Sequence, residues 1–389
     1  ANKLSIAELI ADGDELADRI ERAHTGEIDI EEAVQPYLQL VRENDKDEYT
    51  GLKISDIWRY CRLTWSTPAE TTPGRTMQYL IRDAAHPMHA VMGIASLENC
   101  AVQITCRDDY IGWNQRAFID RVITLDSDAA KDELKQLLVY LEDGINGIDY
   151  SELCTELVVQ NPTDTDIQLL LDEASNAEQS RQQLLRNEVE SDIDDGEKSE
   201  LGSISIDTEK ALYRRKRAEQ LARLLSAKKS IRDLINSDNF NEVWIDFCKS
   251  EAGNSAIRSA LVAQKTKHIG SSLMELNVCG AIPPYNEILG GKLVALLATS
   301  PQVVHDYKER YADKASEIAS RLKGAPVCRP ADLVYVGTTS LYYVGSSQYN
   351  RLKIPGKVFN TDFDIVWKQL GMTIGFGTMH ISKATTMSL

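Results

Sequence analysis

Runs of apolar residues mark several strands along this chain, and helical spacing marks the stretches between them. Residues 276–282 (LNVCGAI) form an apolar run of the length expected for a buried strand. Two prolines end the run, because proline cannot donate a hydrogen bond to a sheet. Leucines then recur at helical spacing over 289–297, and Ser300-Pro301 is a typical helix start. We expect 276–311 to fold as a strand, a glycine-containing loop and two helices.

Other stretches also show strand-like patterns, in which apolar residues alternate or cluster. They occupy residues 77–81, 90–97, 101–106, 333–343 and 366–381. The third is expected to pair with the second as a hairpin, with Glu98-Asn99 as the turn. The fourth has a polar centre, and the last is expected to form a strand pair with glycine bends.

Helical spacing dominates the remainder of the chain. Residues 3–45 carry apolar residues on one helical face, so an N-terminal helical arm is expected. Residues 129–142 form a clear amphipathic helix that Gly144 closes. The composition of the acidic stretch 188–200 predicts a solvated linker or flexible tip. A long basic helix with leucines on one side is expected to begin at Thr208.

The strand-like patterns stop near residue 113 and resume near residue 273, which indicates a helical insertion within one α/β domain. The predicted fold class is α/β (α+β), with a mixed central sheet. Its predicted parts are an N-terminal helical arm at 1–50, the first part of the α/β domain at 51–113, the helical insertion at 114–270 and the second part of the domain at 271–389.

Composition narrows the function classes. The chain has 389 residues and a net charge of −16, so a sequence-independent nucleic-acid coat is disfavoured, although a local basic face is not. The seven cysteines include no CxxC pair, which indicates reduced thiols. Reduced thiols favour a cytoplasmic location. The sequence shows no signal peptide and no apolar run of about 18 residues, so no membrane span is predicted.

The glycine pair Gly290-Gly291 precedes the leucine-rich helix. Glycines at a helix start let an anionic group approach the backbone N–H groups, and pyrophosphate is the usual ligand. The same pair also fits an ordinary turn. Both interpretations, a phosphate-binding loop and a turn, stay open at this point.

Other polar positions are candidates for ligand contacts. Arg107-Asp108 either orients a ligand or satisfies the backbone at a strand end. Thr338, Thr339 and Ser340 lie in the middle of an apolar stretch and form either a ligand shelf or a polar turn. The histidines of the motif HPMH (86–89) give two ligands in an expected loop, whereas metal sites need three or four, so no metal site is predicted.

The basic helix has two interpretations. Arg214, Arg215 and Arg217 are its candidate contacts to DNA or to a partner protein. Alternatively, the helix packs antiparallel against the acidic half of the same insertion. The strongly negative charge of the chain favours the second interpretation.

Several long sequence blocks resemble the DruA family of the Druantia anti-phage defence systems. They are DIWRYCRLTWSTP (56–68), PGRTMQYLIRDAA (73–85), VMGIASLENCAVQITCRDDYIGW (91–113), CGAIPPYNEILGGKLVALL (279–297) and TTSLYYVGSSQYNRLKIP (338–355). The resemblance covers the strand-rich parts. It implies a bacterial cytoplasmic protein that acts with other Druantia proteins, including a large helicase, and it implies no particular biochemical activity.

The order of elements around the glycine pair is similar to that in the GCN5-related N-acyltransferases. In that family the loop after the fourth strand holds the pyrophosphate of coenzyme A, and a tyrosine after the fifth strand often protonates the leaving thiolate. The resemblance assigns Gly290, Gly291 and Lys292 to a coenzyme A thioester and Tyr349 to the proton transfer. Glu287 departs from the family pattern, which has Arg or Gln at its position, and its carboxylate repels a pyrophosphate.

Three hypotheses for function follow. The first is an acyltransferase-like enzyme that uses Tyr349, with Glu287 or Glu275 as the general base. The second is a non-catalytic adaptor that binds phage DNA or a partner protein through the helical insertion. The third is a nuclease built on carboxylates such as Asp108 and Asp109, for which no two-metal spacing is present.

Overall fold

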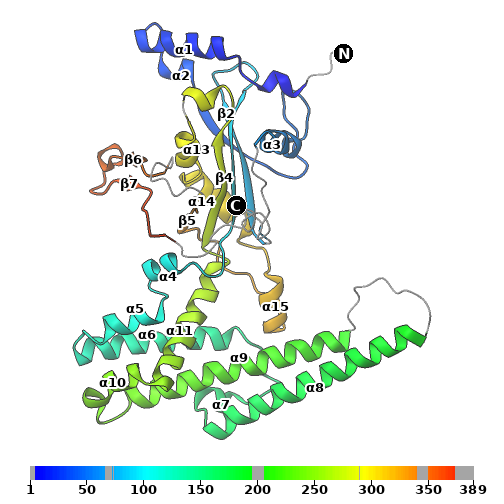
Figure 1. The fold of residues 1–389 in the computed structure, drawn as a ribbon, viewed down its shortest axis with the longest axis vertical. Coiled ribbons are helices and arrows are strands. Elements are labelled where there is room, and N and C mark those ends of the chain that lie inside the picture. The colour runs from blue at the N-terminus through cyan, green and yellow to red at the C-terminus, as the bar shows by residue number, and fades with distance from the viewer. Residues whose placement is uncertain are drawn as a thin grey trace, which may run out of the picture. The chain divides into compact units, whose positions relative to one another are not determined.

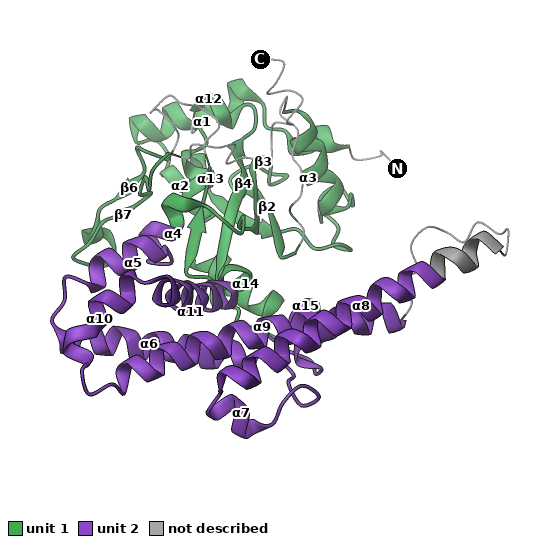
Figure 2. Ribbon diagram, turned by 60° about the horizontal axis from the view of Figure 1, so that its bottom comes forward, with its two compact units in different colours: residues 1–107, 269–312, 330–389 green, residues 108–268, 313–329 purple. Residues whose placement is uncertain are grey.

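The chain folds into two compact units in a computed structural model that describes residues 5–65, 72, 74–194, 206–288, 290–339 and 349–372. The first, called the α/β unit, comprises Ala1–Arg107, Ile269–Ala312 and Pro330–Leu389. The second, called the helical unit, comprises Asp108–His268 and Asp313–Arg329 (Figure 2). Among the described residues, none of the helices combines the length and the apolar character needed to cross a membrane.

A mixed five-stranded sheet forms the centre of the α/β unit (Figure 1). Its strands follow in the order β1 (Pro36–Leu40), β2 (Thr76–Asp83), β3 (Val91–Asn99), β4 (Leu273–Ala281) and β5 (Tyr335–Gly337). The first four strands pair antiparallel, and β5 joins β4 in parallel. A parallel neighbour requires a crossover connection, which the helices between β4 and β5 supply.

Side chains of β2, β3 and β4 alternate between two hydrophobic clusters, one on each face of the sheet. One face, called the α13 face, carries Tyr79, Leu97, Met274 and Leu276. It is covered by α1 (Gly13–Thr25), α12 (Tyr285–Ile288), α13 (Lys292–Leu297) and α14 (Pro301–Tyr311). The other, called the α3 face, carries Leu80, Ile94 and Val278 and is covered by α3 (Ile54–Leu63).

Three short elements complete the description of the α/β unit. Near the N-terminus, η1 (Ile6–Leu9) and α2 (Ile30–Ala33) flank α1. After β5, a small two-stranded sheet pairs β6 (Lys353–Ile354) with β7 (Ile365–Val366), and η2 (Gly356–Phe359) lies in the connection between them.

Helices build the described part of the second unit around a large apolar cluster. They are α4 (Thr105–Ile111), α5 (Gln115–Val122), α6 (Ser127–Asn146), α7 (Glu156–Gln160), α8 (Asp164–Asp194), α9 (Ile206–Ile235), α10 (Phe240–Lys249), α11 (Glu251–Ile269) and α15 (Glu317–Lys323). The two longest, α8 and α9, lie side by side and run in opposite directions (Figures 1 and 2). Leucines on one side of α9, among them Leu221 and Leu225, enter the cluster, as the helical spacing predicts.

Several predicted elements are confirmed and others are wrong. The helix expected to close at Gly144 continues to Asn146, and Glu98-Asn99, expected to form a turn, are the last residues of β3. Strands β2, β3 and β4 lie where the apolar runs predict them. Residues 36–40, expected to be helical, form β1 instead, a strand that Pro36 begins at the sheet edge, where a missing donor costs nothing. Residues 101–106, expected to pair with β3, form a loop and the start of α4, because β3 pairs with β2 and β4 on its two sides.

Candidate functional site

The parallel strands β4 and β5 pair over three residues only within the described part of the chain. The paired stretch runs from Leu273 opposite Tyr335 to Glu275 opposite Gly337, whereas β4 continues along β3 to Ala281. Directly after the pairing, the Thr338 hydroxyl donates to the carbonyl oxygen of Leu276 at 3.0 Å. The end of the β4–β5 pairing therefore places Glu275 beside the residues that follow β5.

Two buried carboxylates face each other at this position. Glu275 lies directly opposite Glu98 of β3, and opposed residues of an antiparallel pair place their Cβ atoms about 5 Å apart on one face. Both point to the α3 face, because their neighbours Leu97, Met274 and Leu276 point to the α13 face. Glu98 is 2% exposed and Glu275 is 8% exposed. Buried carboxylates of this kind require hydrogen-bond donors or cations nearby.

Hydrogen bonds satisfy the carboxylate of Glu98. It accepts from the Asn277 side-chain amide at 3.0 Å, from the Thr72 backbone N–H at 2.7 Å and from the Ser96 hydroxyl at 3.1 Å. Asn277 is the extra residue where the β3–β4 register shifts, so the irregularity of β4 supplies one of these donors. Glu98 is therefore held in place by three donors.

The carboxylate of Glu275 has different hydrogen-bond partners from that of Glu98. It accepts a short hydrogen bond from the Thr339 hydroxyl. The Arg107 guanidinium, 1% exposed, donates to the carbonyl oxygens of Ala101 at 2.7 Å and Val102 at 3.3 Å. Thus a carboxylate with a hydroxyl partner and a buried guanidinium belong to the same end of the sheet.

The side chains of Cys100 and Tyr335 show that Arg107 and Glu275 share one environment. Burial raises the pKa of the Cys100 thiol to about 12, with the charge of Glu275 raising it further and Arg107 lowering it. Burial likewise raises the pKa of Tyr335 to about 12, and the charges of Arg107 and Glu275 act on it in the same two directions. Both groups are therefore uncharged at neutral pH.

We call this group the Glu275 cluster. Its members are Ser96, Glu98, Cys100, Arg107, Glu275, Asn277, Tyr335 and Thr339.

The structure brings some of the predicted ligand residues together and separates others. Arg107 and Thr339 belong to the Glu275 cluster, and Thr338 bonds to the adjacent backbone. Asp108 belongs to the helical unit, where Lys265 donates to its carboxylate at 2.6 Å. Ser340 lies outside the described residues.

The predicted cofactor loop follows the far end of β4. Gly290 has a left-handed backbone with φ of +58°, and a Cβ placed there would meet no atom within 4 Å. Gly291 caps α13, and Lys292 is the first residue of that helix. Glu287 is exposed and accepts from the Asn286 amide at 3.0 Å. The loop is therefore open to solvent, and water screens the charge of Glu287.

Tyr349 lies on the α13 face rather than beside Glu275. Its half-buried ring packs against the cluster on that face, 4.8 Å from the ring of Trp367 at an interplanar angle of 50°. The structure does not bring Tyr349 and Glu275 together on one face of the sheet. Their assigned roles stay predictions.

The arginines of the basic helix are paired within the helical unit. Arg214 contacts Glu173, and Arg215 donates to Glu178 at 2.7 Å, both across the α8–α9 pair. Arg217 donates to the carbonyl oxygen of Arg321 at 2.6 Å. The helix therefore packs against acidic residues of the same unit, which is the second of its two interpretations.

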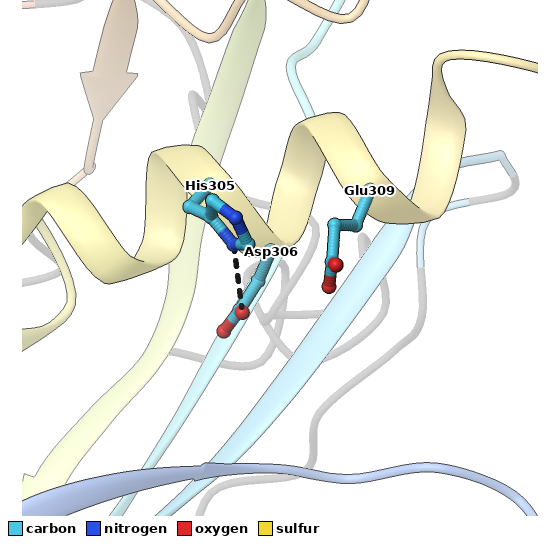
Figure 3. A group of neighbouring side chains, drawn as sticks. All are labelled: His305, Asp306 and Glu309. Carbon is cyan, nitrogen blue, oxygen red and sulfur yellow. Dashed lines mark ion pairs between the residues drawn. The ribbon is translucent and has the colours of Figure 1, made fainter.

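One group of potential metal ligands occurs among the described residues. His305, Asp306 and Glu309 project from α14, and their ligand atoms lie within 4.8 Å of one another (Figure 3). His305 and Glu309 are exposed, and Asp306 accepts from the Tyr79 hydroxyl at 3.0 Å. Exposed acidic groups often gather in this way without an ion, so the trio carries no metal assignment.

The histidines of the HPMH motif serve the backbone and a neighbouring tyrosine. His86 Nδ1 accepts from the Met88 N–H at 3.2 Å, and Nδ1 of His89 lies 2.8 Å from the Tyr37 hydroxyl. The carbonyl oxygens of Met88 and His89 accept from Arg82, whose guanidinium also pairs with buried Asp47. The motif thus anchors a buried arginine.

Glu98 is a site residue that the sequence pattern does not predict. The pattern places it in a turn, although a lone acidic residue at the end of an apolar run is a signal for it. A buried carboxylate becomes visible only once its strand is known to continue and its neighbour is known to be β4.

Comparison with known proteins gives one family. A family model described as "Druantia protein DruA" matches residues 3–130 and 259–388. The Druantia protein DruA of Escherichia coli (strain UMEA 4076-1) is 37% identical over 141 residues, which is 35% of this chain. The alignment spans about a third of that relative, 31% of its length. No solved structure matches.

Proposed function

Because the chain belongs to the DruA family of Druantia proteins, we propose that it is a component of a bacterial anti-phage defence system and that its α/β unit is acyltransferase-like. The matched segments contain all five strands of the sheet and the residues of the Glu275 cluster. The family relationship therefore concerns the unit that carries the candidate site.

The order of the elements between β4 and β5 supports the acyltransferase-like hypothesis. Strand β4 is followed by Gly290, Gly291 and the helices α13 and α14, and β5 then returns parallel to β4. This is the succession on which the resemblance to the GCN5-related N-acyltransferases rests. In the proposal, the glycine loop is the phosphate end of the site, and the Glu275 cluster is the reacting end.

The spacing between the two ends suits an extended ligand. Glu275 precedes Ala281, the last residue of β4, by six residues, which at about 3.3 Å per residue is roughly 20 Å along the strand. Coenzyme A thioesters separate their phosphates from the reactive carbonyl by a long flexible arm. The β4–β5 pairing in the described residues ends at Glu275, between the two proposed ends of the site.

The residues of the glycine loop fit a pyrophosphate in part. The open left-handed Gly290 allows close approach, and Lys292 supplies a positive charge. Glu287 opposes the ligand, but it is exposed and hydrogen-bonded to Asn286, so its repulsion is screened. We assign Gly290, Gly291 and Lys292 to a coenzyme A thioester on this basis. The thioester would supply the activated acyl group.

The position of Glu275 carries the proposal. A buried carboxylate can take a proton from an attacking nucleophile such as an amine, provided that the proton lies within hydrogen-bond reach. Thr339 and Asn277 orient the two carboxylates, and Arg107 offsets their charge. Glu275 is therefore the proposed general base in place of Glu287.

A Glu275→Gln protein tests this role. The change removes the charge and retains the shape, so we expect acyl transfer to fall by about 10²- to 10⁴-fold with the melting temperature unchanged within a few degrees. Glu287→Gln is the matched control and should retain transfer. Phage protection in cells should follow the same order. Equal activity of the two variants would contradict the assignment.

Tyr349→Phe tests the second assigned role separately. The variant keeps the ring that packs against Trp367. Loss of transfer without loss of acetyl-CoA binding would support proton donation by the hydroxyl. Unchanged transfer would remove Tyr349 from the reaction and leave the role of Glu275 intact.

The proposed partners are those that the family relationship implies. We propose that the chain acts in the bacterial cytoplasm with other Druantia proteins, including a large helicase, during defence against phage DNA. Co-purification of the full chain with the co-expressed helicase tests the partnership. Its absence at physiological salt would contradict a stable complex.

A further inference from the structure

Tyr335 lies on the same face of the sheet as Glu275. In the parallel pairing of β4 and β5, Val336 is opposite Met274, and both side chains pack in the cluster on the α13 face. Because side chains alternate along a strand, Tyr335 points to the α3 face, to which Glu275 also points. The tyrosine and the proposed general base therefore belong to one side of the sheet.

The ring of Tyr335 lies over Gly337, which is the residue paired with Glu275. A Cβ at Gly337 would lie 2.7 Å from the Tyr335 hydroxyl oxygen and 2.7 Å from Cε1 of the ring, so the ring fills the space that a side chain would take. Gly337 is opposite Glu275 in the pairing, and neighbouring strands are about 4.8 Å apart. The phenolic hydroxyl is therefore held about one strand spacing from the backbone of Glu275.

The hydroxyl of Tyr335 is available as a donor, because it has no hydrogen-bond acceptor in the described part of the chain. The other hydroxyls of the Glu275 cluster are already committed, since Ser96 donates to Glu98 and Thr339 donates to Glu275. Burial raises the pKa of Tyr335 to about 12, so the hydroxyl keeps its proton at neutral pH. A neutral phenol in this position can donate to an oxygen on which negative charge develops.

We infer that the Tyr335 hydroxyl donates a hydrogen bond to the carbonyl oxygen of the acyl thioester and stabilises the negative charge that this oxygen gains during transfer. This role rests on the proposed function. The amine nitrogen bonds to the carbonyl carbon, and the carbonyl π electrons move to the oxygen and return as the C–S bond breaks. Glu275 takes one proton from the amine, and the thiolate gains one to leave as the thiol. Tyr335 keeps its own proton throughout.

The charges around the hydroxyl suit this role. Burial is the main cause of the raised pKa of Tyr335, and the positive charge of Arg107 acts in the opposite direction, so the guanidinium favours negative charge at this position. The carboxylate of Glu275 disfavours such charge, but it becomes neutral when it takes the proton of the amine. The transfer step therefore removes the opposing charge as the carbonyl oxygen becomes negative.

Infrared spectroscopy of the full chain with bound acetyl-CoA, labelled with ¹³C at the thioester carbonyl, tests the inference without an acceptor amine. A donated hydrogen bond weakens the carbonyl bond, so the carbonyl stretch should lie at lower frequency in the unaltered protein than in Tyr335→Phe. The Kd measured by calorimetry should rise by no more than about tenfold, the effect of one ordinary hydrogen bond. Transfer to an amine should fall by about 10²- to 10³-fold.

Two further variants separate the hydroxyl from the ring. Gly337→Ala retains the hydroxyl, but the added Cβ displaces the ring, so the carbonyl frequency should move toward that of Tyr335→Phe. Tyr60→Phe is the matched control, because it removes a hydroxyl at an exposed position of α3, and it should keep the frequency of the unaltered protein.

The outcomes distinguish this inference from the proposed function. A carbonyl frequency that is the same in the unaltered protein, Tyr335→Phe and Gly337→Ala overturns the inference and leaves the proposed function in place. So does a rate of transfer that Tyr335→Phe leaves unchanged. Absence of acetyl-CoA binding by the unaltered chain contradicts the proposed function itself, and the role of Tyr335 falls with it.

Discussion

Glu98 and Glu275 lie directly opposite each other on neighbouring antiparallel strands, and both carboxylates are buried on the same face of the sheet. The two differ in their partners, because three donors hold Glu98 and a threonine hydroxyl bonds to Glu275. In the proposed function, Glu98 has a structural role and Glu275 a chemical one.

The structural part of Glu98 predicts a stability difference between two substitutions. Glu98→Ala leaves the Asn277 amide, the Ser96 hydroxyl and the Thr72 N–H without their acceptor, so we expect a loss of about 3 kcal/mol in the free energy of unfolding. Glu98→Gln keeps one acceptor oxygen and should cost about 1 kcal/mol. Urea unfolding at pH 7 measures both. Equal losses would show that the hydrogen bonds contribute little.

Asp47 and Arg82 form a buried ion pair at 2.9 Å, with both side chains 1% exposed. Removal of one partner leaves an uncompensated buried charge, so Asp47→Ala should destabilise the α/β unit by about 3 to 5 kcal/mol. The control is Glu48→Ala, at a neighbouring residue outside the pair, which should change stability by less than about 0.5 kcal/mol. Thermal unfolding distinguishes the two.

The same pair predicts a dependence of stability on pH. Burial by itself would raise the pKa of Asp47, but hydrogen bonds from Thr50 and Arg82 and the charge of Arg82 hold the pKa below its usual value. A lowered pKa gives stability that is fully present above the unfolded pKa of about 3.9 and is lost as the pH falls through the folded value. Asp47→Asn should flatten this part of the acid unfolding curve. An unchanged curve would assign the acid sensitivity to other carboxylates.

Arg215 of α9 and Glu178 of α8 should contribute to the stability of the helical unit rather than to DNA binding. Their side chains are joined at 2.7 Å and are partly exposed, so Arg215→Glu should cost about 1 kcal/mol. The double variant Arg215→Glu/Glu178→Arg restores opposite charges and should recover most of that loss. Gel-shift assays with duplex DNA should show no difference between the unaltered protein and either variant. DNA binding that follows Arg215 alone would contradict the pairing account.

Gly93 of β3 allows the close packing of α13 on the sheet. A Cβ at this position would lie 2.6 Å from Val294 Cγ2 and 2.7 Å from the Gly280 carbonyl oxygen, so Gly93→Ala should destabilise the fold by about 1 to 3 kcal/mol. Gly270→Ala is the matched control, because a Cβ there meets no atom within 4 Å. Similar melting temperatures for the two variants would contradict this packing.

The sequence was sufficient for the strands whose apolar runs are long. β2, β3 and β4 are buried on both faces by helices, so continuous apolar stretches mark them. β1 is not predicted, because a partly covered edge strand has no continuous apolar stretch. Its few apolar residues also fit helical spacing. The predicted strand at 333–343 is confirmed over Tyr335–Gly337, and 340–343 lie outside the described residues. Of the strand pair predicted at 366–381, only Val366 belongs to a strand, 367–372 are irregular, and 373–381 lie outside the described residues.

The candidate site was only partly accessible from sequence. Arg107 and Thr339 stood out as polar residues in apolar surroundings, and both belong to the Glu275 cluster. The pairing of Glu98 with Glu275 was not predictable, because the two residues are separated by the whole helical insertion and meet only through the β3–β4 register. Local patterns carry no information on such long-range contacts.

Calorimetric titration of the purified chain with acetyl-CoA tests the central claim most directly. Gly290→Asp adds a negative charge to the proposed phosphate loop, and Gly51→Asp adds the same charge and the same backbone strain at another open left-handed glycine of the α/β unit. We predict micromolar binding for the unaltered chain and for Gly51→Asp, and loss of binding for Gly290→Asp. No heat from the unaltered chain, or equal binding by both variants, would contradict an acyltransferase-like site in this protein.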